Sequence, residues 1–143
     1  MRVAPCAQRT GSRLSADGYN LVKAMIKVIR LAGLLAIVSI GFLSVVPGEV
    51  RPHVLASGQL EHFGAYGVAG FILGFGYFGR LPLLRLGVGL TIYSGALEVA
   101  QLFIPGRSSR RIDFYASSLG AWSGITLVLL LYSTLGRRFS LRE

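Results

Sequence analysis

The stretch Gly95–Gly124, GALEVAQLFIPGRSSRRIDFYASSLGAWSG, decides the fold, because its charged residues are concentrated between two apolar runs. Glu98 and Gln101 are three residues apart within the first run and therefore share one helical face. A Pro-Gly pair then ends the helix. From Phe114 the chain continues for 23 residues without a charge. The stretch predicts a membrane helix, a short charged loop and a return helix.

The composition of the whole chain supports this interpretation. The 143 residues are 52% hydrophobic and include 19 glycines, and charged residues avoid four long windows. A helix needs about 20 apolar residues to cross the hydrocarbon core. We therefore predict an all-α membrane protein, a compact bundle of four transmembrane helices with short loops. The predicted spans cover residues 28–46, 63–79, 86–104 and 114–136.

The predicted transmembrane domain covers residues 28–136. The segments before and after it are basic. Residues 1–27 are expected to form a mobile cytoplasmic tail, and residues 137–143 form a second basic tail. Eleven of the 15 basic residues lie in these tails, in the first residues of span one or in the second loop, which share one side of the membrane when the number of spans is even. The positive-inside rule then places both termini in the cytoplasm of a bacterial inner membrane.

The third loop runs against this charge distribution. Arg107, Arg110 and Arg111 lie there on the predicted outer side. Their partners are expected to be nearby carboxylates, lipid phosphates or an anionic ligand, although a short loop of mixed charge can also simply be tolerated. We attribute the net charge of +9 to topology and to contact with anionic membrane lipids, and expect no nucleic-acid partner.

Polar residues gather at the predicted outer ends of spans two, three and four. Glu98 should lie about 10 Å below the outer end of its span, where an unpaired carboxylate is costly. We therefore expect it to face the bundle and to be paired or protonated. His62 and Tyr66 share a face near the outer end of the second span, although both also suit ordinary positions at a helix end. The candidate ligand-binding residues are Glu61, His62, Tyr66, Glu98, Gln101, Arg107, Arg110, Arg111 and Asp113.

Glycines at a spacing of four residues predict close helix packing. The pairs are Gly70 with Gly74 in the second span and Gly120 with Gly124 in the fourth. This spacing lets two helix backbones approach closely in a membrane. The contacts would hold the polar residues at the helix ends in a fixed relation.

The residues also resemble a known family. His62-Phe63-x-x-Tyr66, then Glu98-x-x-Gln101, then Pro105-Gly106-Arg107, Asp113 and Gly120 is similar in order and spacing to the VanZ-like family of small bacterial membrane proteins. The family is named for a protein that gives low-level resistance to the glycopeptide teicoplanin, and no reaction is established for it. The chain departs from the family pattern at Gly58 and Gln59, where an acidic residue and a lysine are common, and at Ser117, where an asparagine is common.

The sequence leaves three hypotheses for function. The first is a polar pocket at the periplasmic face that binds an anionic cell-envelope lipid or peptidoglycan precursor and modulates the envelope or glycopeptide susceptibility. Its partners would be membrane lipids. A homo-oligomer is a further alternative that the sequence does not decide. The guanidinium groups would meet phosphate, because their geometry suits it.

The second hypothesis is an intramembrane enzyme that acts on a lipid-linked substrate, with His62 as general base and Glu98 or Asp113 as its partner. The sequence presents no complete catalytic set, because serines such as Ser117 are candidates only by proximity. The third is a transporter or channel subunit, which needs polar residues at mid-bilayer depth.

No cofactor or metal ion is expected from the sequence. The chain has two histidines, one of them His53 in the first loop, and a single cysteine. It contains no His-x-x-x-His motif.

Overall fold

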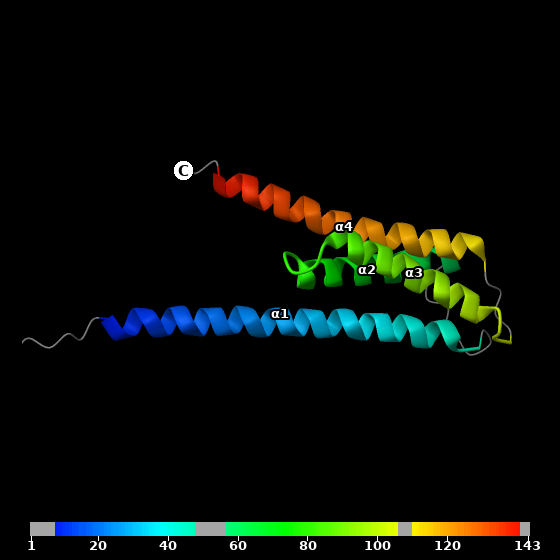
Figure 1. Ribbon diagram of the computed structural model, residues 1–143, viewed down its shortest axis with the longest axis horizontal. Coiled ribbons are helices and arrows are strands. Elements are labelled where there is room, and N and C mark those ends of the chain that lie inside the picture. Colours follow the sequence, from blue (N-terminus) through cyan, green and yellow to red (C-terminus); the bar gives the residue numbers. More distant parts are fainter. Residues whose placement is uncertain (1–7, 48–56, 106–109, 141–143) are drawn as a thin grey trace, which may run out of the picture.

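The computed structural model describes residues 8–47, 57–105 and 110–140, and the chain is helical there apart from short turns. The helices in these residues are α1 (Gln8–Val45), α2 (Gly58–Tyr77), α3 (Leu83–Gln101) and α4 (Arg111–Ser140). Successive helices run in opposite directions, so the start of α1 and the end of α4 lie at the same end of the molecule (Figure 1). The predicted all-helical fold is confirmed.

Helix α1 is longer than the predicted first span. The sequence predicts a mobile tail over residues 1–27, but the chain is helical from Gln8, 20 residues before the predicted start at residue 28. No proline interrupts α1, and each residue added to an existing helix gains a hydrogen bond. The apolar span therefore extends into the basic segment. The resulting helix has 38 residues and a length of about 57 Å, well beyond the hydrocarbon thickness of about 30 Å.

Three helices are long and apolar enough to cross a membrane, which agrees with the prediction of a membrane protein. Among the described residues these segments are Asp17–Val45, Leu83–Gln101 and Arg111–Leu135. Helix α2 is long enough, with 20 residues, but it contains six glycines and a polar first turn and is not among these three segments.

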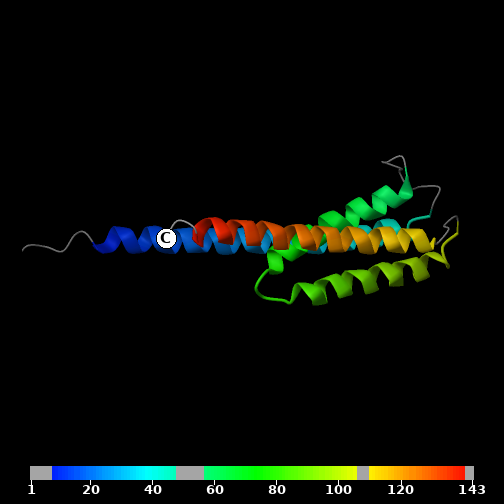
Figure 2. The ribbon, with the colours of Figure 1, turned by 90° about the horizontal axis from the view of Figure 1, so that it is seen from above.

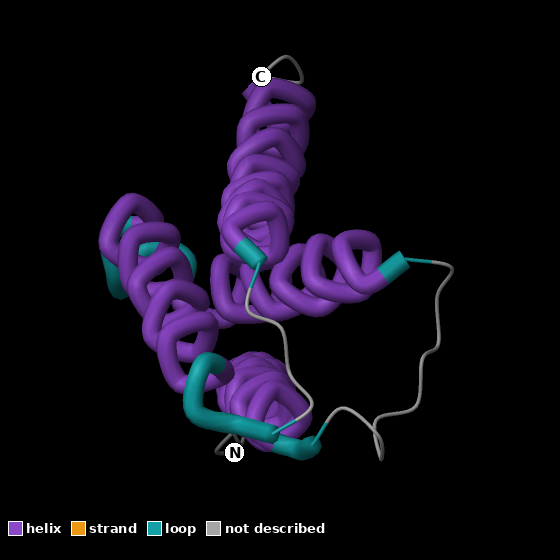
Figure 3. Tube along the Cα trace, turned by 90° about the vertical axis from the view of Figure 1, so that its right-hand side faces the viewer, coloured by secondary structure: helices purple, strands orange, loops and turns teal. Residues whose placement is uncertain are grey.

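The position of α2 accounts for its composition. It contacts α1, α3 and α4, and most extensively α4, whereas α1 and α4 have no contact with each other within the described helices. Figure 2 shows α2 inclined to α4, and Figure 3 shows it crossing the space between α1 and α4. A helix surrounded by other helices needs fewer aliphatic side chains than one surrounded by lipid.

Helices α2 and α4 meet through glycine. A Cβ atom added at Gly120 would collide with the backbone carbonyl oxygen of Phe63, and one added at Gly124 would collide with the carbonyl oxygen of Gly67. A Cβ at Gly70 would come within 2.5 Å of the carbonyl oxygen of Ala121. The predicted role of these glycines in close packing is confirmed, and the contact begins at the residue that follows His62.

The opposite end of α2 is held by α1. The Arg30 side chain donates a hydrogen bond from Nε to the Gly76 carbonyl oxygen over 2.7 Å, and its guanidinium group lies 4.8 Å from the centroid of the Tyr77 ring. A cation is favourable there because the end of a helix carries partial negative charge. Gly79 then turns the chain toward α3 with a φ of 73°, a left-handed conformation that favours glycine.

Candidate functional site

Three helices each contribute one polar residue to a cluster at the end of the bundle where α2 and α4 begin and α3 ends. His62 from α2, Glu98 from α3 and Asp113 from α4 each place a ring nitrogen or carboxylate oxygen within 4.8 Å of the other two. The sequence predicts polar residues at these three helix ends, and the structure brings these three into one group. We call them the His62–Glu98–Asp113 cluster.

The α3 side of the cluster is buried. Glu98 is 8% exposed and Gln101, one turn later, is 2% exposed. The prediction that Glu98 faces the bundle is therefore confirmed. A buried carboxylate so close to a second one is costly unless a proton, a cation or hydrogen bonds compensate its charge.

The imidazole of His62 is oriented by α4. Its Nδ1 lies 3.4 Å from Ser117 Oγ, at the long end of hydrogen-bonding distance. Ser117 is 1% exposed. The Phe63–Gly120 backbone contact lies next to this pair, since Phe63 follows His62 and Gly120 is three residues after Ser117. The glycine packing of α2 against α4 therefore sets the distance between the two side chains.

Tyr66 belongs to the buried core rather than to the membrane surface. It is 2% exposed, and its hydroxyl shares a hydrogen bond with Ser94 of α3. It lies one turn after His62 on α2, as predicted, and it links α2 to α3 below the cluster. Glu61 is partly exposed in the first turn of α2, where an acidic side chain stabilises the helix end.

Two polar atoms of the predicted site residues are buried without a hydrogen-bond partner. Within the described part of the chain these are Gln101 Nε2 and Asp113 Oδ1. The first is a donor and the second an acceptor, and the structure pairs neither of them with the other or with a further group among the described residues. Buried polar groups are rarely left unpaired in native proteins. The site is therefore chemically suited to receive a ligand or an ion.

The predicted arginines do not belong to the His62–Glu98–Asp113 cluster. Arg107 lies outside the described residues. Arg110 and Arg111 are exposed, directly before and at the start of α4, and the Arg110 carbonyl oxygen accepts a 2.9 Å hydrogen bond from the Asp113 amide. Their guanidinium groups are thus available at the rim, two and three residues from Asp113.

Sequence reasoning considered Ser117 only as a nucleophile candidate by proximity, and it did not assign Ser94 to the site. Both are buried, and they contact Tyr66 and His62 respectively. Ser94 is four residues before Glu98, and Ser117 is four residues after Asp113, so each lies on the same helical face as a predicted site residue. That spacing was the available signal.

The polar residues that a transporter would need at mid-bilayer are used between helices. Thr91 accepts a 3.2 Å hydrogen bond from Trp122 Nε1 and donates one of 2.9 Å to the Gly87 carbonyl oxygen. With Ser94 bonded to Tyr66, these groups hold α3 to its neighbours. Nothing in their arrangement favours the transporter hypothesis.

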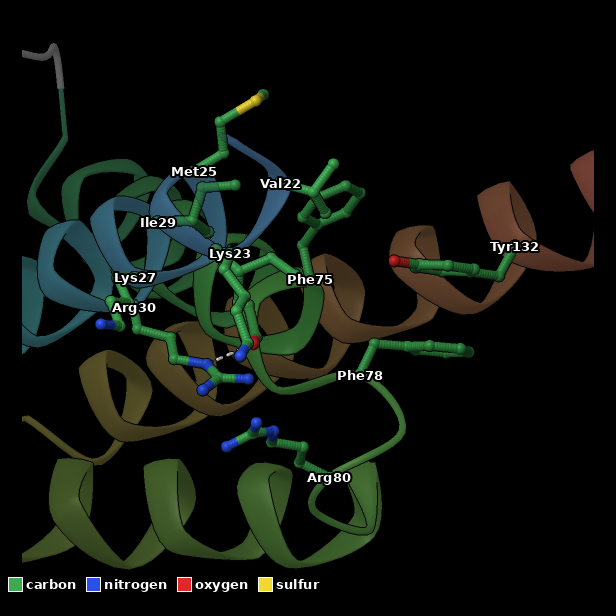
Figure 4. A pocket seen from close by; sticks show the side chains of 12 residues that line it. Val22, Lys23, Met25, Lys27, Ile29, Arg30, Phe75, Phe78, Arg80 and Tyr132 are labelled. Atoms are coloured by element: carbon green, nitrogen blue, oxygen red, sulfur yellow. Dashed lines mark hydrogen bonds between the residues drawn. The ribbon is translucent and has the colours of Figure 1, made fainter. Parts of the chain in front are cut away.

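A second, basic site lies at the opposite end of α2. A cavity of about 500 Å³ opens there between α1, α2 and α4 (Figure 4). Four cations stand among its lining residues, with aromatic rings on the other walls. The cations are Lys23, Lys27, Arg30 and Arg80, and the rings are those of Phe75, Phe78 and Tyr132. Phe78 and Tyr132 are stacked, with centroids 3.6 Å apart.

The fold and the cluster define a class: a small helical protein with three candidate membrane spans and a histidine–carboxylate group, partly buried, at the end of its bundle. Comparison of the chain with protein-family models, with curated proteins and with solved structures finds no match.

Proposed function

We propose that the protein is a VanZ-like, four-span protein of the bacterial inner membrane that binds the headgroup of an anionic envelope lipid or precursor at its periplasmic end. The observation that carries the proposal is the pair of unpartnered buried atoms, Gln101 Nε2 and Asp113 Oδ1, beside His62 and Glu98. A headgroup that combines phosphate oxygens with hydroxyl or amino groups offers an acceptor to the first and a donor to the second. Arg110 and Arg111 would meet its phosphate at the rim.

The VanZ-like assignment is supported by the motif residues that carry the resemblance. His62, Glu98, Gln101 and Asp113 lie on three helices at one end of the bundle. A four-span topology is supported by the antiparallel packing of α2 beside α4, because a helix that pairs with α4 along most of its length reaches a similar depth.

Cysteine labelling tests the topology. In a Cys6→Ala background, Arg110→Cys should react with a membrane-impermeant maleimide added to intact spheroplasts, and Arg85→Cys should react only after permeabilisation. If α2 does not cross the membrane, the two positions exchange sides and the labelling pattern reverses. That reversal would refute the four-span proposal.

Ligand binding can be tested by thermal unfolding in nanodiscs of phosphatidylcholine that contain phosphatidylglycerol, cardiolipin, undecaprenyl phosphate or a lipid-linked peptidoglycan precursor. A ligand that binds the folded state at 100 times its Kd stabilises it by about 2.7 kcal/mol. We expect one anionic lipid to raise the melting temperature of the wild type. Gln101→Leu and an Arg110→Ala, Arg111→Ala double variant should lose this increment.

The matched control is Arg85→Ala, which removes an exposed arginine at the other end of α3. It should keep the increment, since it leaves the cluster intact. Equal loss in Arg85→Ala and in the arginine double variant would mean that the lipids act on the net charge of the protein, and an unchanged increment in Gln101→Leu would refute the proposed site.

One contact favours the enzyme as a second candidate. Ser117 Oγ lies 3.4 Å from His62 Nδ1, with two carboxylates close to the ring, so a hydroxyl, a base and an acid are adjacent. It ranks second because Ser117 is 1% exposed and because Nδ1 faces the serine, whereas Nε2 does so in serine proteases. Labelling of Ser117 by a fluorophosphonate probe, with Ser118→Ala as control and Ser117→Ala as the silent variant, would support hydrolase chemistry.

A further inference from the structure

We propose that the His62–Glu98–Asp113 cluster is a divalent metal site of the Zn²⁺ or Mn²⁺ class. Its three ligand atoms come from three helices, and they lie within 4.8 Å of one another. Metal–ligand bonds of about 2.1 Å at tetrahedral angles put ligand atoms about 3.4 Å apart. The cluster therefore needs to contract by up to about 1.4 Å, which changes in side-chain torsions can supply.

The charge of the cluster calls for a cation. With a neutral imidazole, Glu98 and Asp113 give two negative charges at the end of a membrane bundle, and Glu98 is 8% exposed. Two close carboxylates repel each other when water is excluded, because the local dielectric is low. A divalent cation neutralises both charges.

Unpartnered atoms around the cluster provide an independent reason. Asp113 Oδ1 is buried and accepts no hydrogen bond within the described residues, so it has a lone pair to offer. Gln101 is 2% exposed, and its Nε2 atom has no partner there either. A metal-bound water or anion would give that amide an acceptor.

Ser117 lies where it can hold the His62 ring in position for metal binding. A metal-bound histidine usually holds its other ring nitrogen in a hydrogen bond that fixes the ring. The 3.4 Å contact between Ser117 Oγ and His62 Nδ1 fits that role and makes Nε2 the coordinating atom. Ser117 is thus a positioning residue in this site.

The ligand types select the metal. Imidazole suits Zn²⁺ and other transition metals, and carboxylates also suit Mn²⁺, whereas Ca²⁺ prefers six or more oxygens. Three protein ligands leave at least one position for water or an anionic oxygen. The site can therefore bind a phosphate oxygen, although metal binding itself does not depend on the proposed lipid ligand.

The test is metal binding by the full chain in phosphatidylcholine nanodiscs, after chelator treatment and with no envelope lipid present. Isothermal titration with Zn²⁺ and Mn²⁺ should give about one ion per chain, and Ca²⁺ should bind at least tenfold more weakly. His62→Gln, Glu98→Gln and Asp113→Asn should each weaken Zn²⁺ binding by more than tenfold. Ser117→Ala should weaken it by about tenfold or more, because it disturbs the ligand without removing it.

Two matched controls keep the test specific. Asp17→Asn removes an exposed carboxylate of α1, and His53→Gln removes the other histidine of the chain. Both should bind Zn²⁺ like the wild type. Loss of binding in His53→Gln but not in His62→Gln, or wild-type binding in Glu98→Gln and Asp113→Asn, would overturn the proposal.

A measurement on the wild type covers the case in which cluster variants do not fold. The electron paramagnetic resonance spectrum of Cu²⁺ bound to the chain should show one coordinating imidazole nitrogen, also in the His53→Gln variant. A spectrum without nitrogen coupling would overturn the site. A positive result here with no lipid effect in the unfolding assay would retain the metal site and reject the lipid-binding function, so the two failures are distinguishable.

Discussion

Replacing Gly120 by alanine should both destabilise the bundle and open the candidate site. A Cβ at this position would lie 2.9 Å from the carbonyl carbon of Phe63 and would collide with the attached oxygen. Since the carbon contact must lengthen from 2.9 Å to an ordinary 3.4 Å, α2 and α4 must separate locally by at least about 0.5 Å. Overpacking of this kind costs about 1–3 kcal/mol.

The same displacement acts on the cluster. The distance between His62 Nδ1 and Ser117 Oγ is already 3.4 Å, and another 0.5 Å or so takes it beyond hydrogen-bonding range. Gly120→Ala should therefore lower the melting temperature and weaken Zn²⁺ binding together. The assays are thermal unfolding in nanodiscs and isothermal titration at a temperature where the variant remains folded.

Gly64→Ala is the matched control. Gly64 follows Phe63 on the same helix, and an added Cβ there meets nothing within 4 Å. This substitution should be neutral, or stabilising by up to about 1 kcal/mol through helix propensity. The reasoning is refuted if the two variants unfold alike, or if Gly120→Ala unfolds early yet binds Zn²⁺ as tightly as the wild type.

Three further predictions concern single contacts. Arg30→Met should lower the free energy of unfolding by about 1–2 kcal/mol in denaturant, because it leaves the end of α2 without its charged donor. Lys27→Met on the same helix should leave the free energy of unfolding unchanged. Equal effects of the two substitutions would refute the role of the hydrogen bond. Thr91→Val should alter the fluorescence of the single tryptophan, since Trp122 Nε1 loses its acceptor at 3.2 Å; an unchanged emission spectrum would contradict this contact. Gly79→Ala should cost about 1–2 kcal/mol in thermal unfolding through its φ of 73°, and a neutral result would mean that the turn rearranges.

The helices and much of the polar end could be predicted from the sequence. Apolar runs bounded by charges and by Pro-Gly pairs located all four helices, and the three-residue spacing of Glu98 and Gln101 placed both on one face. The burial of Glu98 and the glycine packing of α2 against α4 followed from membrane energetics. The helical extent of the N-terminal segment could not be predicted in this way, because polar residues that extend a stable helix carry no hydrophobic periodicity of their own.

The metal-ligand geometry was outside the reach of sequence reasoning. A single histidine is a weak signal for a metal site, and its two carboxylate neighbours are 36 and 51 residues further along the chain. Likewise, the spacing of Asp113 and Ser117 shows a shared face on α4, but not that this face meets His62.

The sequence by itself determined that the chain forms apolar helices, which residues share each helical face, and which ends of the helices are polar, because these properties depend only on local periodicity and hydropathy. The tertiary structure decided that α2 lies among the other three helices and that His62, Glu98 and Asp113 converge. The reason is steric: which faces meet depends on where backbones can approach closely, and the absence of side chains at Gly67, Gly120 and Gly124 fixes that approach between α2 and α4.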